Sequence, residues 1–420
     1  MADILIAAYG SRGDIMPLTG IAGALQRVGH RVSMTCTPDL VDEITPLGID
    51  ARPADFRLNA DVDTSAADPL KLAAEMVKPR GMRQLGANLL AAMSDTPADI
   101  VLLTPFAELA GHLFAEARGI PSLGLRLQPM SATGDFPPSL LGAWSAGRVV
   151  NRAAGRSAAR WFDRIYRTPL AGFRAELGLP RRSARSLRNA RTAVKWPIPH
   201  GFSRSVIRTP GDWRHGLEVT GYWWPQDLPD WTPPSELVDF LDAGEAPVYV
   251  GLGSLMVPEK ESARLSEVIG TALRSAGLRG IVSGGGAGLH VEGDDVLTVG
   301  TVPHSWLFPR MRAAVHSCGA GTTAASLRAG LPVVGIPSPG GDQPFWARRL
   351  GRLGVSAATL PRPKLRATQL AEALTAATAD DRYRVAAAQL RDAILAEDGA
   401  DHVVATVDHL LARPGTVTGN

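Results

Sequence analysis

The segment 316–325 reads HSCGAGTTAA and combines a histidine, a cysteine and hydroxyl groups with two glycines, Gly319 and Gly321. Glycine lets a backbone approach another group closely, and the free N–H groups at the start of a helix suit a phosphate. An apolar run precedes the segment, and a helical stretch that ends at Gly330 follows it. The pattern indicates a strand-to-helix turn that holds a diphosphate. A tight turn whose glycines serve packing alone fits the local sequence equally well.

Asp14 is a second group that could do chemistry. It belongs to the stretch GSRGDIMPL, residues 10–18, which follows the first apolar run. A carboxylate at the end of a first strand faces a ligand cleft and can accept a proton as a general base. The alternative is an N-cap for a helix that begins near Pro17, because Asp and a nearby Pro are common at helix starts. Position alone favours the cap.

The glycine segment also allows a dinucleotide site. Gly319, Gly321 and Ala324 satisfy the pattern G-x-G-x-x-A, and Asp342 lies about 20 residues further on, where a ribose-binding acid is expected. An NAD-dependent oxidoreductase is therefore a rival interpretation. The pattern normally opens a nucleotide domain at its first strand, whereas about four βα units precede it in the second half of this chain.

Both halves of the chain alternate short strand-like runs with helical stretches, which is typical of parallel sheets in an α/β fold. In the first half the predicted strands are DILIAAYG, RVSMTCT, ADIVLLTP and PSLGLRL. In the second half they are VYVGLG, RGIVSG, VLTVGT, AAVHSC and PVVGIP. Two doubly wound domains that face each other place the carboxyl ends of both sheets around one central cleft. Asp14 and the glycine segment both lie on that rim.

The chain of 420 residues exceeds the size at which one core usually stops growing, so two domains of roughly 200 residues each are expected. Residues 1–215 are predicted to form the first Rossmann-like domain, and residues 247–395 the second. The segment 216–246 concentrates prolines and tryptophans without a clear strand period, which predicts the linker. Residues 396–420 are predicted to form a helix and tail that could cross back to the first domain.

Composition excludes several classes of protein. Apolar residues make up 45% of the chain and charged residues 20%, and the two cysteines are too few for a disulfide framework or a cysteine zinc site. No cluster of His or carboxylates has the spacing of metal ligands, so no metal site is expected. The first residues carry Asp3 where a signal peptide would be basic, and no run of about 18 apolar residues occurs. These features predict a cytoplasmic protein.

The run 301–355 resembles the donor-binding signature of GT-B glycosyltransferases, in particular the sterol-glucosyltransferase-like and vancomycin-type branch. GSRGDIMPL, RLQPMSAT, VTGYWW and VYVGLGSL resemble further motifs of that family, in its order along most of the chain. The resemblance implies an inverting, metal-independent transfer of a hexose such as glucose from a nucleotide diphosphate-sugar to a small-molecule hydroxyl, with no cofactor. A non-catalytic nucleotide-sugar-binding protein is a further alternative.

The same resemblance implies roles for single residues. Asp14 is the proposed general base, and Asp342 and Gln343 would hydrogen-bond hydroxyls of the donor sugar. Ser317 stands where many members carry a second histidine that contacts a phosphate. For His316 a buried structural role is the favoured interpretation, although it too is a candidate. The other implied donor contacts are Ser11, Arg12, Gly13, Ser254, Val302, His304, Gly319, Ala320, Gly321 and Thr322.

The acceptor is expected on the first domain. The candidate lining is apolar with occasional polar groups, as ligand pockets are, and consists of Phe106, Gln128, Met130 and Phe136. Each of these residues fits a core position equally well. Sterols, polyketides, peptide antibiotics and other lipophilic hydroxyl compounds are all candidate acceptors.

Charge is distributed unevenly along the chain. Residues 145–215 hold 16 Lys and Arg against three acids, a net charge of +13, although the whole chain carries +3. Five arginines recur every four residues and would form one stripe on a helix: Arg148, Arg152, Arg156, Arg160 and Arg164. Pairing with acidic surface elsewhere in the chain is the simpler interpretation, and weak association with anionic membranes is a further hypothesis. Nothing resembles a base-reading module, so no nucleic acid partner is expected.

Overall fold

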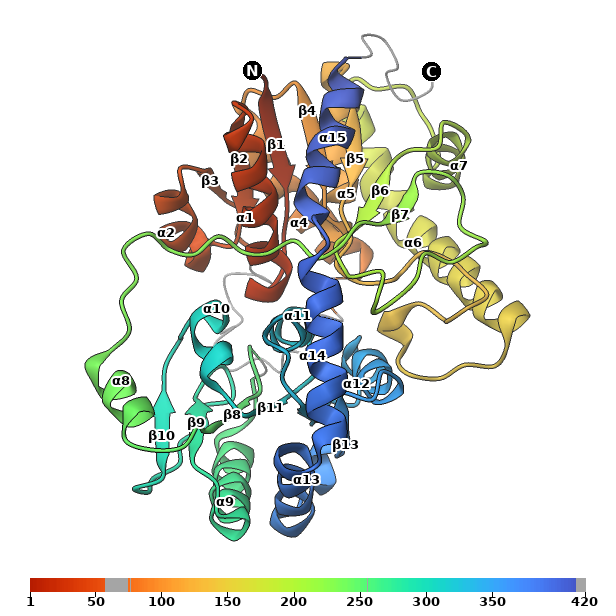
Figure 1. Cartoon of the computed structure of the whole chain (residues 1–420). Coiled ribbons are helices and arrows are strands. Elements are labelled where there is room, and N and C mark those ends of the chain that lie inside the picture. The colour runs from red at the N-terminus through yellow and green to blue at the C-terminus, as the bar shows by residue number, and fades with distance from the viewer. Residues whose placement is uncertain (57–74, 76, 255, 413–420) are drawn as a thin grey trace.

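A five-stranded parallel sheet carries the N-terminal half of the molecule (Figure 1). The computed structural model describes residues 1–56, 75, 77–254 and 256–412. The strand order is β3-β2-β1-β4-β5, so the order reverses between β1 and β4. The strands are β1 (Asp3–Ala7), β2 (Arg31–Cys36), β3 (Asp50–Pro53), β4 (Ile100–Leu103) and β5 (Ser122–Gly124).

Helices cover both faces of this sheet because alternate residues of each strand point to opposite faces. Ile4 and Ile6 of β1 pack with α1 (Arg12–Arg27) on one face. Leu5 and Ala7 pack on the other face with α4 (Pro79–Met93) and α5 (Glu108–Arg118). Further elements complete this half: η1 (Pro38–Leu40), α2 (Val41–Ile44), η2 (Thr45–Leu47), η3 (Pro105–Ala107), η4 (Ser139–Leu141), α6 (Arg148–Glu176) and α7 (Ala184–Ala193).

A six-stranded parallel sheet carries the C-terminal half, in the order β10-β9-β8-β11-β12-β13. This is the strand order of doubly wound nucleotide-binding domains. The strands are β8 (Val248–Gly251), β9 (Gly280–Ser283), β10 (Val296–Val299), β11 (Ala313–His316), β12 (Val333–Gly335) and β13 (Ser356–Thr359). The helices are α8 (Ser235–Asp242), α9 (Glu259–Ala276), α10 (His304–Leu307), η5 (Phe308–Arg310), α11 (Ala320–Ala329), α12 (Gln343–Arg352), η6 (Arg362–Lys364), α13 (Ala367–Ala379) and α14 (Asp381–Leu395).

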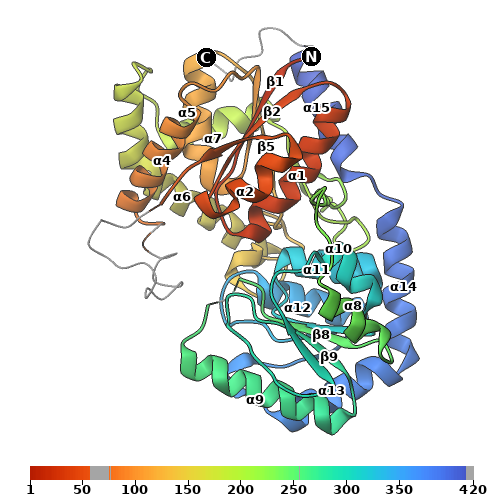
Figure 2. The same ribbon diagram turned by 90° about the vertical axis from the view of Figure 1, so that its left-hand side faces the viewer.

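Two stretches of chain connect the halves. After the short paired strands β6 (Ile198–His200) and β7 (Leu217–Val219), residues 220–234 run without regular structure along α1. There the Gln226 N–H donates to Thr19 Oγ1 at 2.9 Å. At the other end, α14 packs on α11, and α15 (Gly399–Leu411) returns to pack on α1 (Figure 2). The segment 216–246, predicted as the linker, therefore also contains β7 and α8.

The two doubly wound sheets predicted from the sequence are confirmed, and all nine predicted strands are present. Four strands were missed: β3, β6, β7 and β13. They have three or four residues each and lie at a sheet edge or in the small β6–β7 sheet, and none of them contains an apolar run as long as those of the predicted strands. The predicted start of the first helix near Pro17 is wrong, because α1 begins at Arg12 with Ser11 as its N-cap and contains Pro17.

Candidate active site

The first turns of α1 and α11 face each other between the two sheets. Each helix follows a central strand, α1 after β1 and α11 after β11, at the point where doubly wound sheets bind ligands. A Cβ atom on Gly321 would lie 3.8 Å from the Gly13 Cα, an ordinary van der Waals distance, so the two turns lie close together. In α11 the Thr323 N–H donates to the Gly319 carbonyl, which leaves the N–H groups of residues 320–322 without an acceptor inside the helix.

Asp14 lies in the first turn of α1, and three hydrogen bonds hold its carboxylate. Oδ2 accepts from the Ser11 backbone N–H at 3.0 Å and from the Ser11 hydroxyl at 2.8 Å. Oδ1 accepts from Gln128 Nε2 at 3.1 Å. Gly10 makes room for this side chain, because its φ is +149° and a Cβ atom there would lie 2.8 Å from the Asp14 carboxylate. Asp14 therefore stabilises the helix start and also lines a large cavity.

The side chains at the end of β11 are engaged within the C-terminal half. His316 is fully buried, its Nδ1 accepts from the Cys318 N–H at 3.0 Å, and its Nε2 lies 3.2 Å from Ser326 Oγ. Burial lowers the pKa of His316 to about 3, so its ring is neutral. The buried Ser317 hydroxyl donates to the Leu252 carbonyl at 3.3 Å. These contacts support the structural role of His316, and the donor contacts predicted for the two side chains stay predictions.

His304 of the C-terminal half lies within the electrostatic influence of Arg12 of the N-terminal half. Burial and then the charge of Arg12 lower the pKa of His304 to about 4. Arg12 also forms an ion pair with Glu43 of α2, which partly neutralises its charge. Two further predicted donor contacts lie in the C-terminal half. Val302 is half-buried just before α10, and Ser254 is exposed after β8.

Asp342 and Gln343 lie where α12 begins. Asp342 Oδ2 accepts from Trp346 Nε1 at 2.8 Å and makes no side-chain cap of the helix. Burial, opposed by this bond and assisted by the charge of Asp14, raises the pKa of Asp342 to about 6. Gln343 Oε1 accepts from the Ser338 N–H at 2.8 Å. Asp342 lines the same cavity as Asp14, so the structure brings these two predicted residues together.

A cavity opens beside Asp14 and extends into the N-terminal half. Its volume of about 1080 Å³ exceeds the roughly 300–1,000 Å³ of most small-molecule pockets. Three of the four predicted acceptor contacts, Phe106, Gln128 and Met130, line it. Phe136 does not line this cavity, because its ring packs against Phe345 of α12 with centroids 5.6 Å apart, and its role in acceptor binding stays a prediction.

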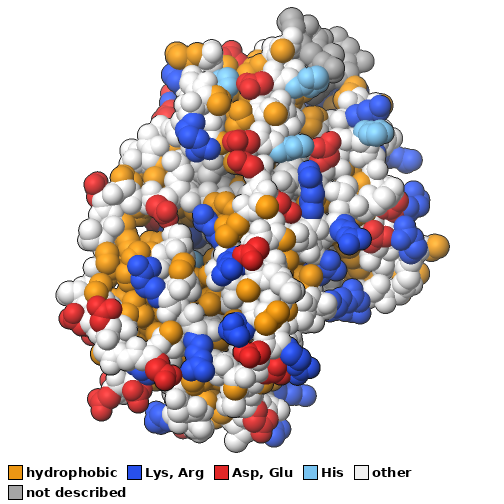
Figure 3. All heavy atoms as spheres, in the orientation of Figure 1, with side chains coloured by type: hydrophobic (Ala, Val, Ile, Leu, Met, Phe, Trp, Pro, Cys, Tyr) orange, Lys and Arg blue, Asp and Glu red, His pale blue; other side chains and the backbone are white. Residues whose placement is uncertain are grey.

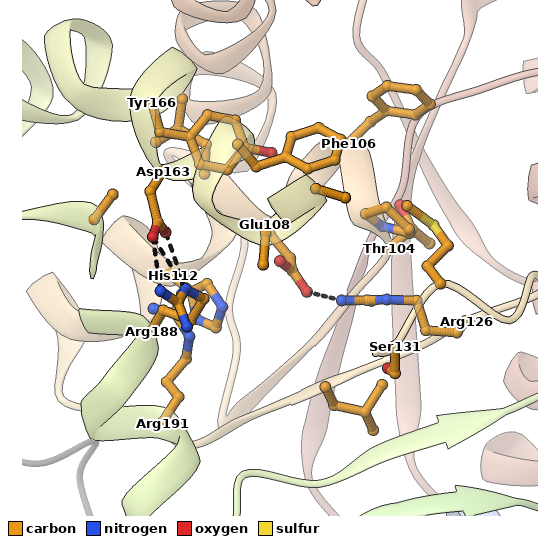
Figure 4. A pocket seen from close by; sticks show the side chains of 18 of the residues that line it. Thr104, Phe106, Glu108, His112, Arg126, Ser131, Asp163, Tyr166, Arg188 and Arg191 are labelled. Atoms are coloured by element: carbon orange, nitrogen blue, oxygen red, sulfur yellow. Dashed lines mark hydrogen bonds and ion pairs between the residues drawn. The ribbon is translucent and has the colours of Figure 1, made fainter. Parts of the chain in front are cut away.

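Part of the cavity wall is charged and polar, which the sequence analysis missed (Figure 4). Within it, Glu108 pairs with Arg126 and Asp163 pairs with Arg188. One signal was present, since Glu108 and position 112 lie four residues apart on one face of α5. The pairing of α6 with α7 leaves no such local signal. We call these side chains the polar cluster: Glu108, His112, Arg126, Asp163, Tyr166, Arg188 and Arg191.

Two features are absent from the part of the chain that the structure describes. Within residues 1–56, 75, 77–254 and 256–412, no group of three or more His, Cys, Asp or Glu side chains is arranged to hold a metal ion. None of the helices described in these ranges has the length and apolar character needed to cross a membrane.

Two doubly wound domains with a cleft between the carboxyl ends of their sheets define the GT-B class of glycosyltransferase. The solved structure of CalG4, the calicheamicin glycosyltransferase, matches the chain with a TM-score of 0.70 over 99% of both chains, at 19% sequence identity. At that identity the likeness shows the fold.

Sequence comparison shows the family. O-mycaminosyltylonolide 6-deoxyallosyltransferase of Streptomyces fradiae is 32% identical over 96% of both chains. Sterol 3-beta-glucosyltransferase UGT80A2 of Arabidopsis thaliana is 32% identical over 97% of this chain, which spans 65% of that relative's length. Residues 281–410 match the family model of the erythromycin biosynthesis protein CIII-like C-terminal domain. On the match to the deoxyallosyltransferase over 96% of both sequences, the chain belongs to the same family of glycosyltransferases.

Proposed function

We propose that the protein transfers a hexose from a nucleotide diphosphate-sugar to a hydroxyl of a lipophilic natural product, with inversion at the anomeric carbon and without a metal ion. The observation that carries this proposal is that one cavity contains Asp14, held by three hydrogen bonds, together with Asp342 and three of the predicted acceptor contacts. The names of the relatives specify a sterol and O-mycaminosyltylonolide, which supports a bulky acceptor here.

In the proposed reaction Asp14 takes the proton of the acceptor hydroxyl as its oxygen attacks C1 of the sugar, and the bond from C1 to the diphosphate breaks. Ser11 and Gln128 orient the carboxylate for this transfer. An oxygen that arrives opposite the leaving group inverts C1 in a single displacement. Asp342 and Gln343 would bind sugar hydroxyls, since a carboxylate accepts hydrogen bonds and an amide both donates and accepts them.

The leaving diphosphate needs its negative charge stabilised. The N–H groups of residues 320–322 and the positive end of the α11 dipole supply fixed partial charges at that place. This arrangement supports a reaction that needs no metal ion. Activity is therefore expected to survive EDTA.

Transfer assays test the proposal directly. The protein is incubated with UDP-glucose or dTDP-glucose and a panel of sterols, polyketides and macrolide aglycones, with and without EDTA. Mass spectrometry is expected to show one added hexose, and NMR an inverted anomeric configuration. Nucleotide binding without transfer to any acceptor would instead favour a nucleotide-sugar-binding protein.

The dehydrogenase alternative predicts a different ligand. The glycine segment follows β11, the fourth strand of its domain in chain order, rather than the first strand β8. We expect UDP or dTDP to raise the melting temperature, because a ligand that binds the native state alone stabilises it. Stabilisation by NAD with none from UDP or dTDP would favour the oxidoreductase.

We also propose weak, reversible contact with anionic membranes through the first half of α6 and the residues before it. The last three arginines of the stripe are exposed and form no hydrogen bond or ion pair with described residues, whereas the first two pair with acids. Exposed apolar side chains lie in the same stretch: Leu140, Leu141, Trp144, Val149, Val150 and Trp161. Three of these also line the cavity, so a membrane at this surface would adjoin a lipophilic acceptor site.

A further inference from the structure

Arg191 of α7 differs from the other arginines that line the cavity. Its guanidinium forms no hydrogen bond or ion pair with any residue that the structure describes, and burial lowers its pKa. The Trp196 ring centroid lies 5.9 Å from it, near the roughly 6 Å limit for cation–π attraction. The other arginines of the wall all have partners: Arg126, Arg174 and Arg188 pair with carboxylates, Arg214 donates to carbonyls, and Arg182 is also engaged.

The charge of Arg191 therefore has no carboxylate of its own among the described residues. Glu108 and Asp163 act on Arg191 electrostatically, but each is already paired with another arginine. His112 is neutral, because burial and the charges of Arg191 and Arg126 hold its pKa well below the usual range. Its buried Nε2 has no hydrogen-bond partner among the described residues.

His112 and Arg191 lie on the same side of the polar cluster (Figure 4). The His112 ring packs on Trp196 with centroids 4.7 Å apart, and the Arg191 guanidinium approaches the same indole. The two unpartnered polar groups thus share one aromatic neighbour. A ligand that reaches Trp196 meets a cation and an imidazole together.

Arg191 is half-buried in the cavity wall without an anion, and a carboxylate would compensate its charge with two parallel charge-assisted hydrogen bonds. We propose that the cavity takes a ligand with a carboxylate that binds Arg191; on the proposed function, on which this assignment rests, that ligand is the acceptor. A neutral sterol would leave Arg191 unpaired. The protein is thereby specific for hydroxy acids over their neutral counterparts.

The positions of Asp14 and Arg191 in the cavity define the shape of this acceptor. The same cavity includes Asp14 in the first turn of α1 and Arg191 on α7, elements that lie well apart in Figure 1. The reacting hydroxyl and the carboxylate must therefore lie at opposite ends of an elongated molecule. A steroid acid with a hydroxyl on its first ring and a carboxylate on its side chain has this form.

Binding of a matched pair of compounds tests the proposal without requiring turnover. 3β-Hydroxy-5-cholenoic acid and its methyl ester are titrated at pH 7.5 against the wild type, Arg191→Gln and Arg185→Gln, by calorimetry and without a sugar donor. Arg185 is an exposed arginine of the same helix that does not line the cavity, so it is the matched control. Because a hydrogen bond to a charged group is worth more than a neutral one, the wild type should bind the acid about 10–100-fold tighter than the ester.

In Arg191→Gln this preference should disappear while affinity for the ester stays unchanged, and Arg185→Gln should behave as the wild type. Equal binding of acid and ester by the wild type, a preference that persists in Arg191→Gln, or no binding of either compound would each overturn the proposal. Transfer from UDP-glucose to the acid is measured separately. No transfer with the binding preference intact would overturn the proposed function while supporting the carboxylate site.

Discussion

At the residue scale, Asp14 both stabilises the start of α1 and lines the cavity. Its Oδ2 is occupied by the two Ser11 donors at the helix start, and its Oδ1 accepts a hydrogen bond from Gln128. A carboxylate fixed in this way has one orientation relative to the cavity. That fixed orientation is what a general base needs, because proton transfer depends on geometry before it depends on pKa.

Asp14→Asn is expected to lower turnover by about 10²–10⁴-fold, because the amide keeps the shape of the side chain but cannot take the proton. Binding of the nucleotide, followed by calorimetry, should remain nearly unchanged. Asp42→Asn removes an exposed carboxylate of α2 and is the control. Retention of more than about a tenth of wild-type turnover at saturating substrate would exclude Asp14 as the base.

Asp342 makes stability depend on pH. Its pKa is about 6 in the folded protein against 3.8 for an ordinary aspartate, so between these values the folded chain holds a proton that the unfolded chain releases. The free energy of unfolding therefore falls as pH rises through this window. Asp342→Asn has no such proton to lose. The difference in melting temperature, variant minus wild type, should therefore rise between pH 4 and about 6 and stay constant above pH 6. A difference that does not change from pH 4 to 7.5, as expected for Asp42→Asn, would contradict the shift.

At the element scale, the sequence predicted those strands whose apolar runs are buried on both faces, such as β4 and β8. It could not predict β3, whose charged residues lie at a sheet edge, or the position of Phe136, which is set by contact with α12. The polar cluster was missed for the same reason, because its two ion pairs join elements far apart in sequence. Asp14, Gly319 and Asp342 could be placed near one cleft from the sequence, since they follow strand ends that the topology brings together.

Gly20 shows how an element can be fixed by a contact from another one. It lies within α1, where alanine would ordinarily favour the helix, yet a Cβ atom there would collide with the Trp224 carbonyl of the connecting segment. Gly20→Ala is therefore expected to destabilise the protein by about 1–3 kcal/mol in urea unfolding. Gly351→Ala near the end of α12, where a Cβ atom meets nothing within 4 Å, should instead be neutral or stabilising. Equal stability of the two variants would show that the segment around Trp224 moves away from the new Cβ atom without cost.

At the scale of the whole molecule, charge and apolar exposure coincide on one surface. Basic side chains gather along the right-hand side of the view in Figure 3, over α6. Of the five arginines of the stripe, Arg148 and Arg152 form ion pairs with acids of the same half. The other three form no ion pair with described residues. Arg148 pairs with Asp135 outside the basic segment 145–215, as expected from the sequence, whereas Arg152 pairs with Asp212 of that segment itself. The remaining basic surface consists of Arg156, Arg160 and Arg164, and exposed Trp161, which lines the cavity, lies among them in the sequence.

Cosedimentation with vesicles tests the membrane contact. The wild type is expected to pellet with phosphatidylserine-containing vesicles at low salt, less at high salt, and not with phosphatidylcholine alone, because each arginine near an anionic surface contributes about 1 kcal/mol within a Debye length. Removing the charges of Arg156, Arg160 and Arg164 together by Gln should abolish most of this binding. Glutamine at three exposed cations of the other half, Lys260, Lys364 and Arg366, removes the same charge and should leave binding nearly intact. An equal loss of vesicle binding in both triple variants would show that binding depends only on the net charge of the protein. Negligible pelleting under every condition would contradict the membrane contact.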